Sequence, residues 1–426
     1  MATIRPFRGI RPAADKAASV AALPYDVYSR KEAKEETLRH PLSFLNIDRP
    51  ETQFPDDIDM YSPQVYEKAK ELLDDMIGSG TFIQDDTPCF YLYAQTMNGR
   101  TQTGLVGCAS IDDYLEQRIK KHENTLAAKE QDRICHIDAL SAQTGPIFLA
   151  YRSNPDLQEI IRQLTAGLPL CDFTSEDLVR HQVWKISSDE TIRRITGLFS
   201  GIQSLYIADG HHRAASAVKV GLKRREQFPG CLGDEEFNYF LSVLFPADEL
   251  CIYDYNRVVK DLNHCTFEQF LAMISDGFEI TETGTSICRP ARKGEIGMYM
   301  NRTWYLLRAK TFLLSDDPVD GLDVSILQNT ILNPILGIAD PKTDSRISFV
   351  GGIRGLEALM QMTDQTDDGV AFAMYPTSMD ELLAVADAGR LMPPKSTWFE
   401  PKLRSGLFIH QFEKGEKDND KTHGKK

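Results

Sequence analysis

The chain has 426 residues, 42% of them hydrophobic and 26% charged, and a formal net charge of −14 at pH 7. This composition is that of a globular protein, and its acidity argues against a general nucleic-acid binder, though not against a local basic pocket. No stretch approaches the roughly 18 consecutive apolar residues of a membrane helix. We therefore expect a cytoplasmic protein of two or three domains, without nucleic-acid or membrane partners and with self-association left open.

The cysteines show no spacing typical of a zinc site, because none forms a C-x-x-C pair and no two are close in sequence. Several lie in apolar runs, which predicts buried free thiols. They are Cys89, Cys108, Cys135, Cys171, Cys231, Cys251, Cys265 and Cys288.

The first part of the chain carries local signals for two helices and a hairpin. After about 28 irregular residues, Ser29 and Glu32 have the spacing of a capping box and predict a helix start. A second helix is expected over 63–78, with a proline at its first position. The run 89–111 holds two β-rich segments around an Asn-Gly pair, a favoured two-residue hairpin turn.

The rest of the chain mixes helices and strands without strict βαβ alternation, which predicts an α+β (mixed α/β) fold. Helices are expected at 155–168, 189–201, 319–338 and 379–390, and strands at 183–188, 204–210 and 369–378, with a strand pair at 238–259.

Residues 205–217, "LYIADGHHRAASA", place polar residues at the end of an apolar strand. A glycine after Asp209 permits a sharp turn and a close approach of a ligand to the backbone. The following helix is expected to begin near His212 or Arg213, where unpaired N–H groups and the helix dipole favour anions. Arg213 adds a planar fork for phosphate oxygens, and Asp209 is a candidate to hold a metal ion or to orient a histidine.

Two other interpretations of this segment stand beside the anion site. An Asp-Gly turn is common, and the histidine after it can be a simple helix cap. A zinc site is weaker still, because adjacent histidines on an extended chain point in opposite directions. No H-x-H or H-E-x-x-H pattern accompanies His211 and His212.

"ADGHHRAASA" resembles the nucleotide-binding motif of ParB-like and sulfiredoxin-like folds, and in particular the D-G-H-H-R of kinases that phosphorylate free L-serine. A longer resemblance, from residue 4 to about 409, is to the family catalogued as domain of unknown function 1015 (DUF1015). The matching segments are "IRPFRGIRP", "LPYDVYS", "RIKKHENTLAAKEQDR", "TGPIFLAY", "YIADGHHRAASA", "YNRVVKDL", "LDVSILQNTILNPILGI" and "LMPPKSTWFEPKLRSGLFI".

The resemblance implies a domain plan. A ParB-like nucleotide-binding core at about 100–225 would lie within an N-terminal lobe, 1–250. A C-terminal α/β lobe, 251–410, would contribute the loop "MPPKSTWFEPKLRSG". Residues 411–426 are expected to be a disordered tail, since the last 13 residues of the chain contain no apolar residue.

The resemblance also implies an activity: ATP-dependent phosphorylation of free L-serine to O-phosphoserine, with Mg²⁺ and with ADP as an alternative donor. Glu123 would be the base, because a glutamate in a similar K-P-H-E loop has that role in the serine kinases. Here Lys121 replaces the proline of that loop, and Leu23 replaces the first proline of the family's P-P-Y-D-V; neither change removes a reactive group. Without the resemblance, the sequence favours the interpretation of Glu123 as a solvated loop carboxylate.

The remaining site residues follow from the same resemblance and from charge clustering. Asp26 is a candidate for the ammonium group of serine, and it can equally cap the helix at Ser29. We expect catalytic roles for Glu123, Asp209 (also the Mg²⁺ ligand) and His211, nucleotide or phosphate binding by His122, Gly210, His212 and Arg213, and substrate binding by Asp26, Lys395, Ser396, Thr397, Lys402 and Arg404.

Three other functions compete with the kinase. A ParB-like nucleotide switch would require a basic DNA-binding module, and the sequence shows no convincing one. A metal-dependent hydrolase using His211 and His212 is disfavoured by their spacing. An interaction protein that has lost the chemistry is disfavoured by the joint presence of four residues, namely Glu123, Asp209, His211 and Arg213.

Overall fold

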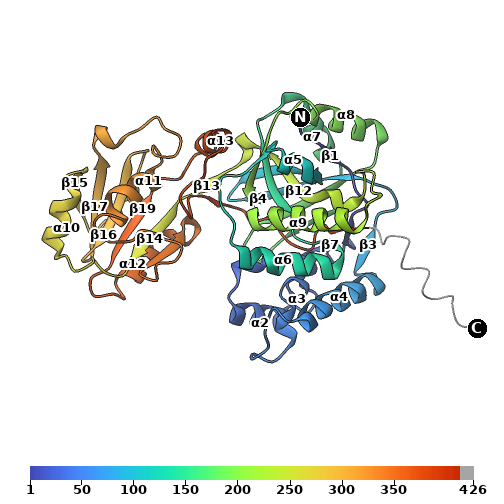
Figure 1. Cartoon of the computed structure of the whole chain (residues 1–426), viewed down its shortest axis with the longest axis horizontal. Coiled ribbons are helices and arrows are strands. Elements are labelled where there is room, and N and C mark those ends of the chain that lie inside the picture. The colour runs from blue at the N-terminus through green and yellow to red at the C-terminus, as the bar shows by residue number, and fades with distance from the viewer. Residues whose placement is uncertain (413–426) are drawn as a thin grey trace, which may run out of the picture. The chain divides into compact units, whose positions relative to one another are not determined.

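The computed structural model describes residues 1–412 and divides them into two compact units. Unit 1 contains Met1–Lys120, Asn124–Glu249 and the described residues from Pro401 on, and unit 2 contains Lys121–Glu123 and Leu250–Glu400. Both units combine helices with mainly antiparallel sheets, so the expected α+β class is confirmed (Figure 1).

Unit 1 is built on a nine-stranded sheet with the strand order β6-β11-β8-β12-β5-β4-β10-β9, and β1 adds to β5. Most neighbours are antiparallel, but β12 runs parallel to β8 and β11 runs parallel to β6. The strands are β1 (Ile4–Arg5), β4 (Phe90–Met97), β5 (Arg100–Ser110), β6 (Ile119–Lys120), β8 (Ile147–Tyr151), β9 (Cys171–Thr174), β10 (Arg180–Ile186), β11 (Leu205–Asp209) and β12 (Tyr239–Pro246).

Local signals in the sequence determine several of these elements. The hairpin between β4 and β5 turns at Asn98 and Gly99, which have φ values of 52° and 78°, as a type I′ turn requires. The predicted capping box at Ser29 is confirmed: its hydroxyl accepts from the Glu32 N–H, and the Glu32 carboxylate accepts from the Ser29 N–H.

The helices of unit 1 include two that pack side by side, α6 and α9 (Figure 1). Their interface contains a hydrogen bond from the Ser216 hydroxyl to the Glu130 carbonyl, 3.0 Å. The helices are α1 (Ala17–Val20), α2 (Arg30–Arg39), α3 (Leu45–Asp48), α4 (Pro63–Gly78), α5 (Ile111–Leu115), α6 (Ala127–Leu140), α7 (Pro155–Thr165), α8 (Asp189–Phe199) and α9 (His211–Gln227).

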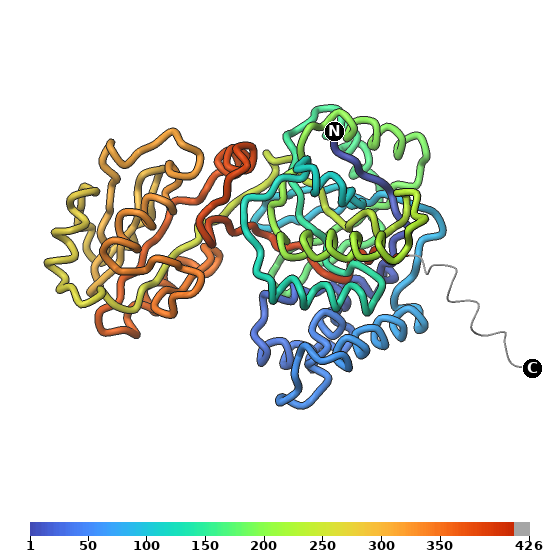
Figure 2. The backbone as a smooth tube through the Cα atoms, in the orientation of Figure 1, coloured from blue at the N-terminus to red at the C-terminus, as the bar shows by residue number. Residues whose placement is uncertain are grey.

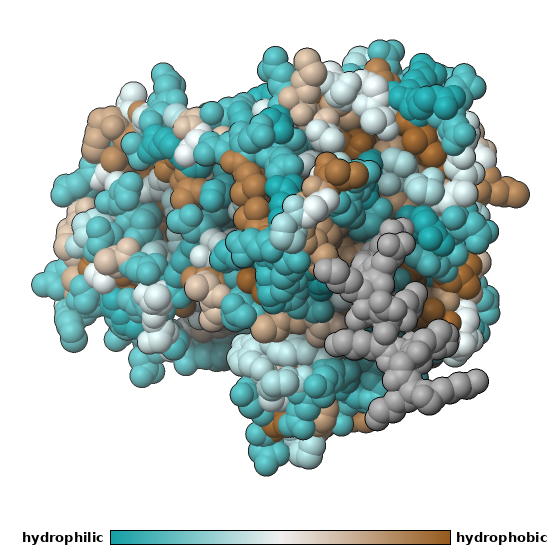
Figure 3. Space-filling model, turned by 45° about the vertical axis from the view of Figure 1, so that its right-hand side comes forward, coloured by the Kyte–Doolittle hydropathy of each residue, from teal (hydrophilic) through white to brown (hydrophobic). Residues whose placement is uncertain are grey.

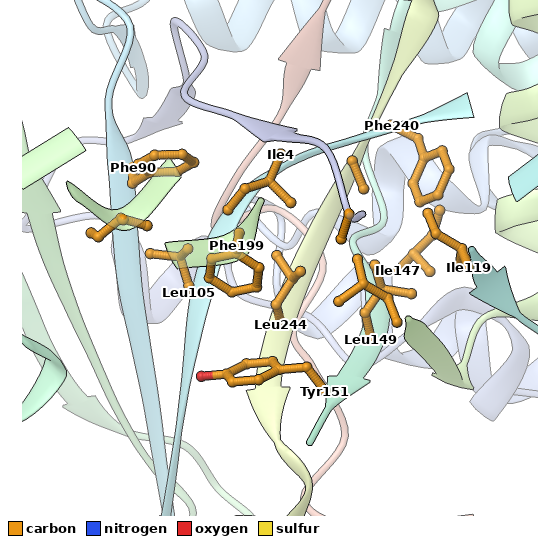
Figure 4. Close-up of a cluster of buried hydrophobic side chains, with 14 of the residues drawn as sticks. Ile4, Phe90, Leu105, Ile119, Ile147, Leu149, Tyr151, Phe199, Phe240 and Leu244 are labelled. Atoms are coloured by element: carbon orange, nitrogen blue, oxygen red, sulfur yellow. The ribbon is translucent and has the colours of Figure 1, made fainter. Parts of the chain in front are cut away.

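The main hydrophobic core of unit 1 joins the sheet to the helices packed on it. Strand residues such as Leu105, Leu149 and Leu244 meet Phe199 of α8, and Tyr151 packs edge-on against Phe199 with ring centroids 5.2 Å apart (Figure 4). Burial of this apolar surface is the main favourable term for folding, and it fixes the strand ends that carry polar residues.

Unit 2 contains a six-stranded sheet with the order β15-β17-β16-β19-β14-β18. Its strands are β14 (Tyr255–Val259), β15 (Phe278–Gly284), β16 (Glu295–Met300), β17 (Thr303–Ala309), β18 (Ile347–Gly351) and β19 (Val370–Met374), and its helices are α10 (Phe267–Ile274), α11 (Asp323–Leu327), α12 (Gly355–Thr363) and α13 (Met379–Asp387). A short pair, β13 (Ile252–Tyr253) and β20 (Trp398–Phe399), completes this unit.

The expected strand pair at 238–259 is wrong. The two strands form but do not pair with each other: β12 lies between β5 and β8 in unit 1, and β14 lies between β18 and β19 in unit 2. The chain passes from one unit to the other at Leu250. The apolar run that suggested a strand pair therefore contributes one strand to the sheet of each unit.

The C-terminal segment also differs from the expected plan. From Pro401 on it belongs to unit 1, whereas the sequence placed 251–410 in one lobe. Ile409 bridges to Ile10, and β21 (His410–Gln411) pairs with β7 (Ala142–Gln143) (Figure 2). Gln411 is therefore in a strand and Phe412 is buried; the rest of the expected tail, 413–426, lies outside the described residues.

The surface shown is mostly polar. On the face shown in Figure 3, hydrophilic residues predominate and hydrophobic ones are dispersed among them. No helix within residues 1–412 is both long and apolar enough to span a membrane. Each of the eight cysteines is a free thiol, but only Cys89, Cys108 and Cys288 are fully buried.

Candidate functional site

The end of β11 turns sharply into α9. Asp209 is the last strand residue, Gly210 has a φ of +93°, and the helix begins at His211, one residue earlier than expected. The left-handed conformation of Gly210 explains the glycine, because residues with a Cβ rarely adopt it. The turn delivers the first N–H groups of a 17-residue helix beside the Asp209 carboxylate.

Arg213 is held rigidly within this turn. Its Nη1 donates a hydrogen bond to the Pro146 carbonyl at 2.6 Å, and its Nη2 lies 3.5 Å from Asp209 Oδ2. Two glycines make room for it: an added Cβ would lie 3.2 Å from Arg213 Cδ at Gly145, and 3.0 Å from Nε at Gly210. The guanidinium is thus preorganised, with only 13% of its side chain exposed.

Asp209 faces two cations. Lys402 Nζ lies 3.5 Å from the same Oδ2 that Arg213 approaches, and Oδ1 accepts from the Gly210 N–H at 2.9 Å. Burial opposes ionisation of Asp209, but the charges of Lys402 and Arg213 outweigh it and hold the pKa of this carboxyl well below its usual range. The turn therefore carries a net positive charge around one fixed carboxylate.

The two histidines of the motif differ in their surroundings. His211 is buried, 6% exposed, at the first position of α9. His212 Nε2 accepts a hydrogen bond from the Leu126 N–H at 2.9 Å, so this nitrogen helps to cap the start of α6. In this arrangement Nε2 is an acceptor and does not donate to a phosphate.

A cavity of about 460 Å³, counting its open mouth, lies beside Arg213 within unit 1. We call it the Asp48 cavity. Its polar walls include Tyr25, Asp48, Arg133, His136, Thr144 and Arg213. Only Arg213 of this set was a sequence candidate. Three of the segments that carry the family resemblance contain residues of this wall: "LPYDVYS" contains Tyr25, "RIKKHENTLAAKEQDR" contains Arg133 and "TGPIFLAY" contains Thr144.

The other predicted residues fall into two groups, one in each unit. In unit 2, the His122 carbonyl accepts from the Met392 N–H at 2.8 Å, which joins the segment Lys121–Glu123 to the loop that carries Lys395. Glu123 is partly buried and Lys395 is exposed. The structure thus brings the expected base and part of the expected substrate loop into one unit.

Within that loop, Ser396 has internal partners. Its hydroxyl donates to the Pro393 carbonyl at 2.6 Å, and its own carbonyl accepts from the Thr377 hydroxyl at 3.0 Å. The neighbouring Lys395 carbonyl accepts from Arg257 Nη2 at 3.1 Å. Thr397 is partly buried. These bonds define the loop conformation and leave the Lys395 ammonium at its surface.

Two expected substrate-binding residues of unit 1, Arg404 and Asp26, have surroundings that do not include Asp209 or Arg213. Arg404 is 5% exposed, and its Nη2 pairs with Asp177 at 2.5 Å and donates to the Ser175 hydroxyl at 3.0 Å. Its guanidinium therefore anchors the C-terminal segment. Asp26 is exposed and lines a second pocket of about 730 Å³, counting its open mouth, beside Tyr61 and Lys129. It does not cap α2, since Ser29 does so with Glu32.

The residues around Asp209 do not form a protein cage for a metal ion. Within residues 1–412, no three His, Cys, Asp or Glu side chains come together in a way that could hold one. Magnesium bound with a nucleotide usually takes only one or two carboxylates, and phosphate oxygens and waters complete its shell. A single carboxylate at a strand end fits that arrangement.

Unit 1 is thus an α+β unit in which the end of strand β11 presents a left-handed turn, a helix N-terminus and a buried arginine. These features lie within the region that identifies the family. The chain belongs to the family described as "Protein of unknown function (DUF1015)", whose model matches residues 4–325.

No curated protein sequence matches the chain, and several solved structures are similar to it at low sequence identity. A free serine kinase mutant in complex with AMP is 12% identical, covering 70% of this chain and 90% of its own, with a TM-score of 0.36. SbnI with C-terminal truncation from Staphylococcus aureus is 13% identical, with coverages of 72% and 87% and a TM-score of 0.36. A conserved hypothetical protein from Pyrococcus furiosus is 15% identical, with coverages of 71% and 93% and a TM-score of 0.35. Similarity at this level does not establish a function.

Proposed function

We propose that this protein is a small-molecule kinase that transfers a phosphoryl group from a nucleoside triphosphate to the hydroxyl of a free amino acid, with ATP and L-serine as the expected pair. The observation that carries the proposal is the Asp209–Arg213 turn: a preorganised guanidinium, a lysine and a helix N-terminus at one strand end. Such a site suits the charge of phosphates, and in phosphoryl transfer positioning and electrostatic stabilisation supply most of the catalysis.

In the proposed reaction the oxygen of the acceptor hydroxyl attacks the γ-phosphorus, and the bond from this phosphorus to the bridging oxygen of the β-phosphate breaks. The products are the phosphorylated amino acid and ADP. The hydroxyl proton goes to the Glu123 carboxylate, which is the group that the resemblance to serine kinases assigns as base. Arg213, Lys402 and the first N–H groups of α9 offset the charge on the phosphate oxygens.

Magnesium would arrive with the nucleotide, and Asp209 is the residue that would hold it. When bound, the ion supplies charge neutralisation at the phosphates. Asp209 also has a role of its own in the proposal, since its carboxylate keeps Arg213 and Lys402 together in the absence of a ligand.

A nucleotide-binding switch without transfer chemistry is the second function that the sequence raised. Both functions use the Asp209–Arg213 turn to bind nucleotide. Formation of a phosphorylated amino acid therefore distinguishes the kinase from the switch. Purified protein is incubated with Mg²⁺, ATP or ADP, and a panel of hydroxy amino acids, and phosphorylated products are detected by mass. Glu123→Gln and Arg213→Ala are tested beside the wild type.

For a kinase we expect O-phosphoserine from the wild type. Glu123→Gln should still bind nucleotide but lose the product, and Arg213→Ala should lose nucleotide affinity. Nucleotide binding without any phosphorylated amino acid, with either donor, would exclude the kinase and leave the switch.

A further inference from the structure

The Asp48 cavity contains a buried carboxylate with an unused oxygen. Asp48 is 2% exposed, and its Oδ1 accepts from the Thr144 hydroxyl at 3.2 Å. Its Oδ2 accepts no hydrogen bond from any residue in 1–412. Arg133 on the same wall compensates part of this charge, but Oδ2 still lacks a hydrogen-bond donor, so this oxygen favours a cationic ligand group.

A neutral imidazole stands beside this carboxylate on the cavity wall. His136 Nε2 donates to the Ile47 carbonyl at 2.9 Å. Burial, and then the charge of Arg133, lower the pKa of His136, so the ring is neutral at ordinary pH. Because Nε2 carries the proton, Nδ1 is an acceptor, and it has no hydrogen-bond partner among the described residues. Asp48 and His136 thus offer two acceptors to one ligand.

A fixed cation lies on the same wall. Arg133 is 7% exposed; its Nε and Nη2 lie 2.9 and 2.7 Å from Asp132 Oδ2, and its guanidinium stacks 4.0 Å from the centre of the Tyr25 ring. Its Nη1 has no hydrogen-bond partner within residues 1–412. The cavity therefore presents acceptors for a cation and a donor for an anion within one small space.

We propose that the Asp48 cavity is the acceptor site and recognises a free α-amino acid by both of its charges. Asp48 Oδ2 and His136 Nδ1 would accept hydrogen bonds from the ammonium group, and Arg133 Nη1 would donate to the carboxylate. A small hydroxylated side chain would then be on the side of Arg213, which lines the same cavity. This deepens the proposed function and rests on it only for the transfer step.

The charges in the cavity are of both signs. Asp48 attracts an ammonium group, whereas Arg133 and Arg213, which line the same cavity, attract a carboxylate or a phosphate. The proposal also moves the ammonium ligand from Asp26, which the sequence suggested, to Asp48, because Asp26 is exposed in the wall of a different pocket.

The first test uses the wild-type full chain and three compounds that share one hydroxymethyl group. By calorimetry, with and without ADP, we compare L-serine with ethanolamine, which lacks the carboxylate, and with 3-hydroxypropionate, which lacks the ammonium group. Each lost charge-assisted contact should weaken binding roughly 10- to 100-fold. Equal affinities for L-serine and 3-hydroxypropionate would overturn the proposal. So would the absence of detectable binding for all three of L-serine, L-threonine and L-homoserine.

The second test uses Asp48→Asn, with Asp138→Asn as the control. Asp138 lies on α6 and pairs with Lys223 and Arg224 on the partly exposed side of the helix. We expect Asp48→Asn to lose affinity for L-serine and ethanolamine but not for 3-hydroxypropionate, and Asp138→Asn to bind all three as the wild type does. A folded Asp48→Asn protein, checked by its melting curve, that binds L-serine normally would contradict the proposal.

The two proposals fail in different ways. An amino acid that binds as described but is never phosphorylated would exclude the kinase and leave the acceptor site. Phosphorylation of 3-hydroxypropionate with the kcat/KM of L-serine would exclude this acceptor site and leave the kinase.

Discussion

Arg213 Nη1 donates a hydrogen bond to the Pro146 carbonyl at 2.6 Å, which ties the first turn of α9 to the loop before β8. The same guanidinium lies 3.5 Å from Asp209 at the end of β11. Two sheet strands and one helix therefore determine the position of a single charged group. A group held in this way pays little ordering entropy when a ligand binds.

Replacing this arginine with lysine should weaken nucleotide binding. Arg213→Lys keeps the charge but removes the planar fork, so it cannot contact Pro146 and a phosphate together. We expect the Kd for ADP to rise roughly tenfold or more, measured by calorimetry. Lys223→Met on the same helix is the control, because Lys223 pairs with Asp138, and it should leave the Kd unchanged. An unchanged Kd in Arg213→Lys would show that Arg213 only supports the fold.

The left-handed turn gives a second prediction. Gly210→Ala should destabilise the protein by about 1–2 kcal/mol, because an alanine at φ +93° is strained and its Cβ would lie 3.0 Å from Arg213 Nε. Urea unfolding measures the loss. Gly230→Ala, where an added Cβ meets nothing within 4 Å, is the matched control and should be close to neutral. A neutral effect at both positions would contradict the assigned turn.

A buried histidine in unit 1 predicts a pH dependence of stability. Burial, and then the charge of Arg404, lower the pKa of His181 to about 3, against about 6.5 in the unfolded chain. The unfolded chain therefore binds the proton first as the pH falls. The stability that depends on neutral His181 is fully present above about pH 6.5 and is lost as the pH falls towards 3.

His181→Gln tests this expectation. Its free energy of unfolding should fall at pH 7, since the ring nitrogens of His181 contact Tyr93 and Ser175 at 2.8 and 2.9 Å. Between pH 6.5 and 4, however, it should depend less on pH than that of the wild type. Equal slopes in urea titrations of the two proteins over this range would contradict the assignment.

A buried amide chain supports Lys402. Gln102 Nε2 donates to Gln95 Oε1 at 3.1 Å, and Gln95 Nε2 donates to the Lys402 carbonyl at 2.9 Å. Gln95→Leu leaves two buried polar groups without partners, at a cost of about 1–3 kcal/mol each. We expect a lower urea midpoint and weaker ADP binding, because Lys402 would no longer be held beside Asp209.

The control for Gln95→Leu is Thr96→Val. Thr96 lies nearer the turn of the same β4–β5 hairpin, where its hydroxyl shares a hydrogen bond of 2.7 Å with that of Thr101. The control variant should change stability by less than about 1 kcal/mol. Wild-type ADP affinity in a destabilised Gln95→Leu protein would show that the amides stabilise the core without positioning Lys402.

The sequence by itself determined the features whose signals are local. The capping box at Ser29, the hairpin turn at Asn98 and the sharp turn at Gly210 each depend on residues within four positions of one another, and the structure contains all three. Propensity and turn chemistry act over that distance, so the chain could be divided into most of its elements and the polar strand end recognised.

Only the tertiary structure decided what surrounds that strand end. Asp48 and Thr144 are hydrogen-bonded although 96 positions separate them, and Lys402 reaches Asp209 because the last segment returns to unit 1. No spacing rule encodes such pairs, since contacts between distant segments arise from the packing of whole elements. The sequence held segments of the cavity wall but did not predict the Asp48 cavity itself, because burial and the lack of a partner are properties that side chains acquire only in the folded chain.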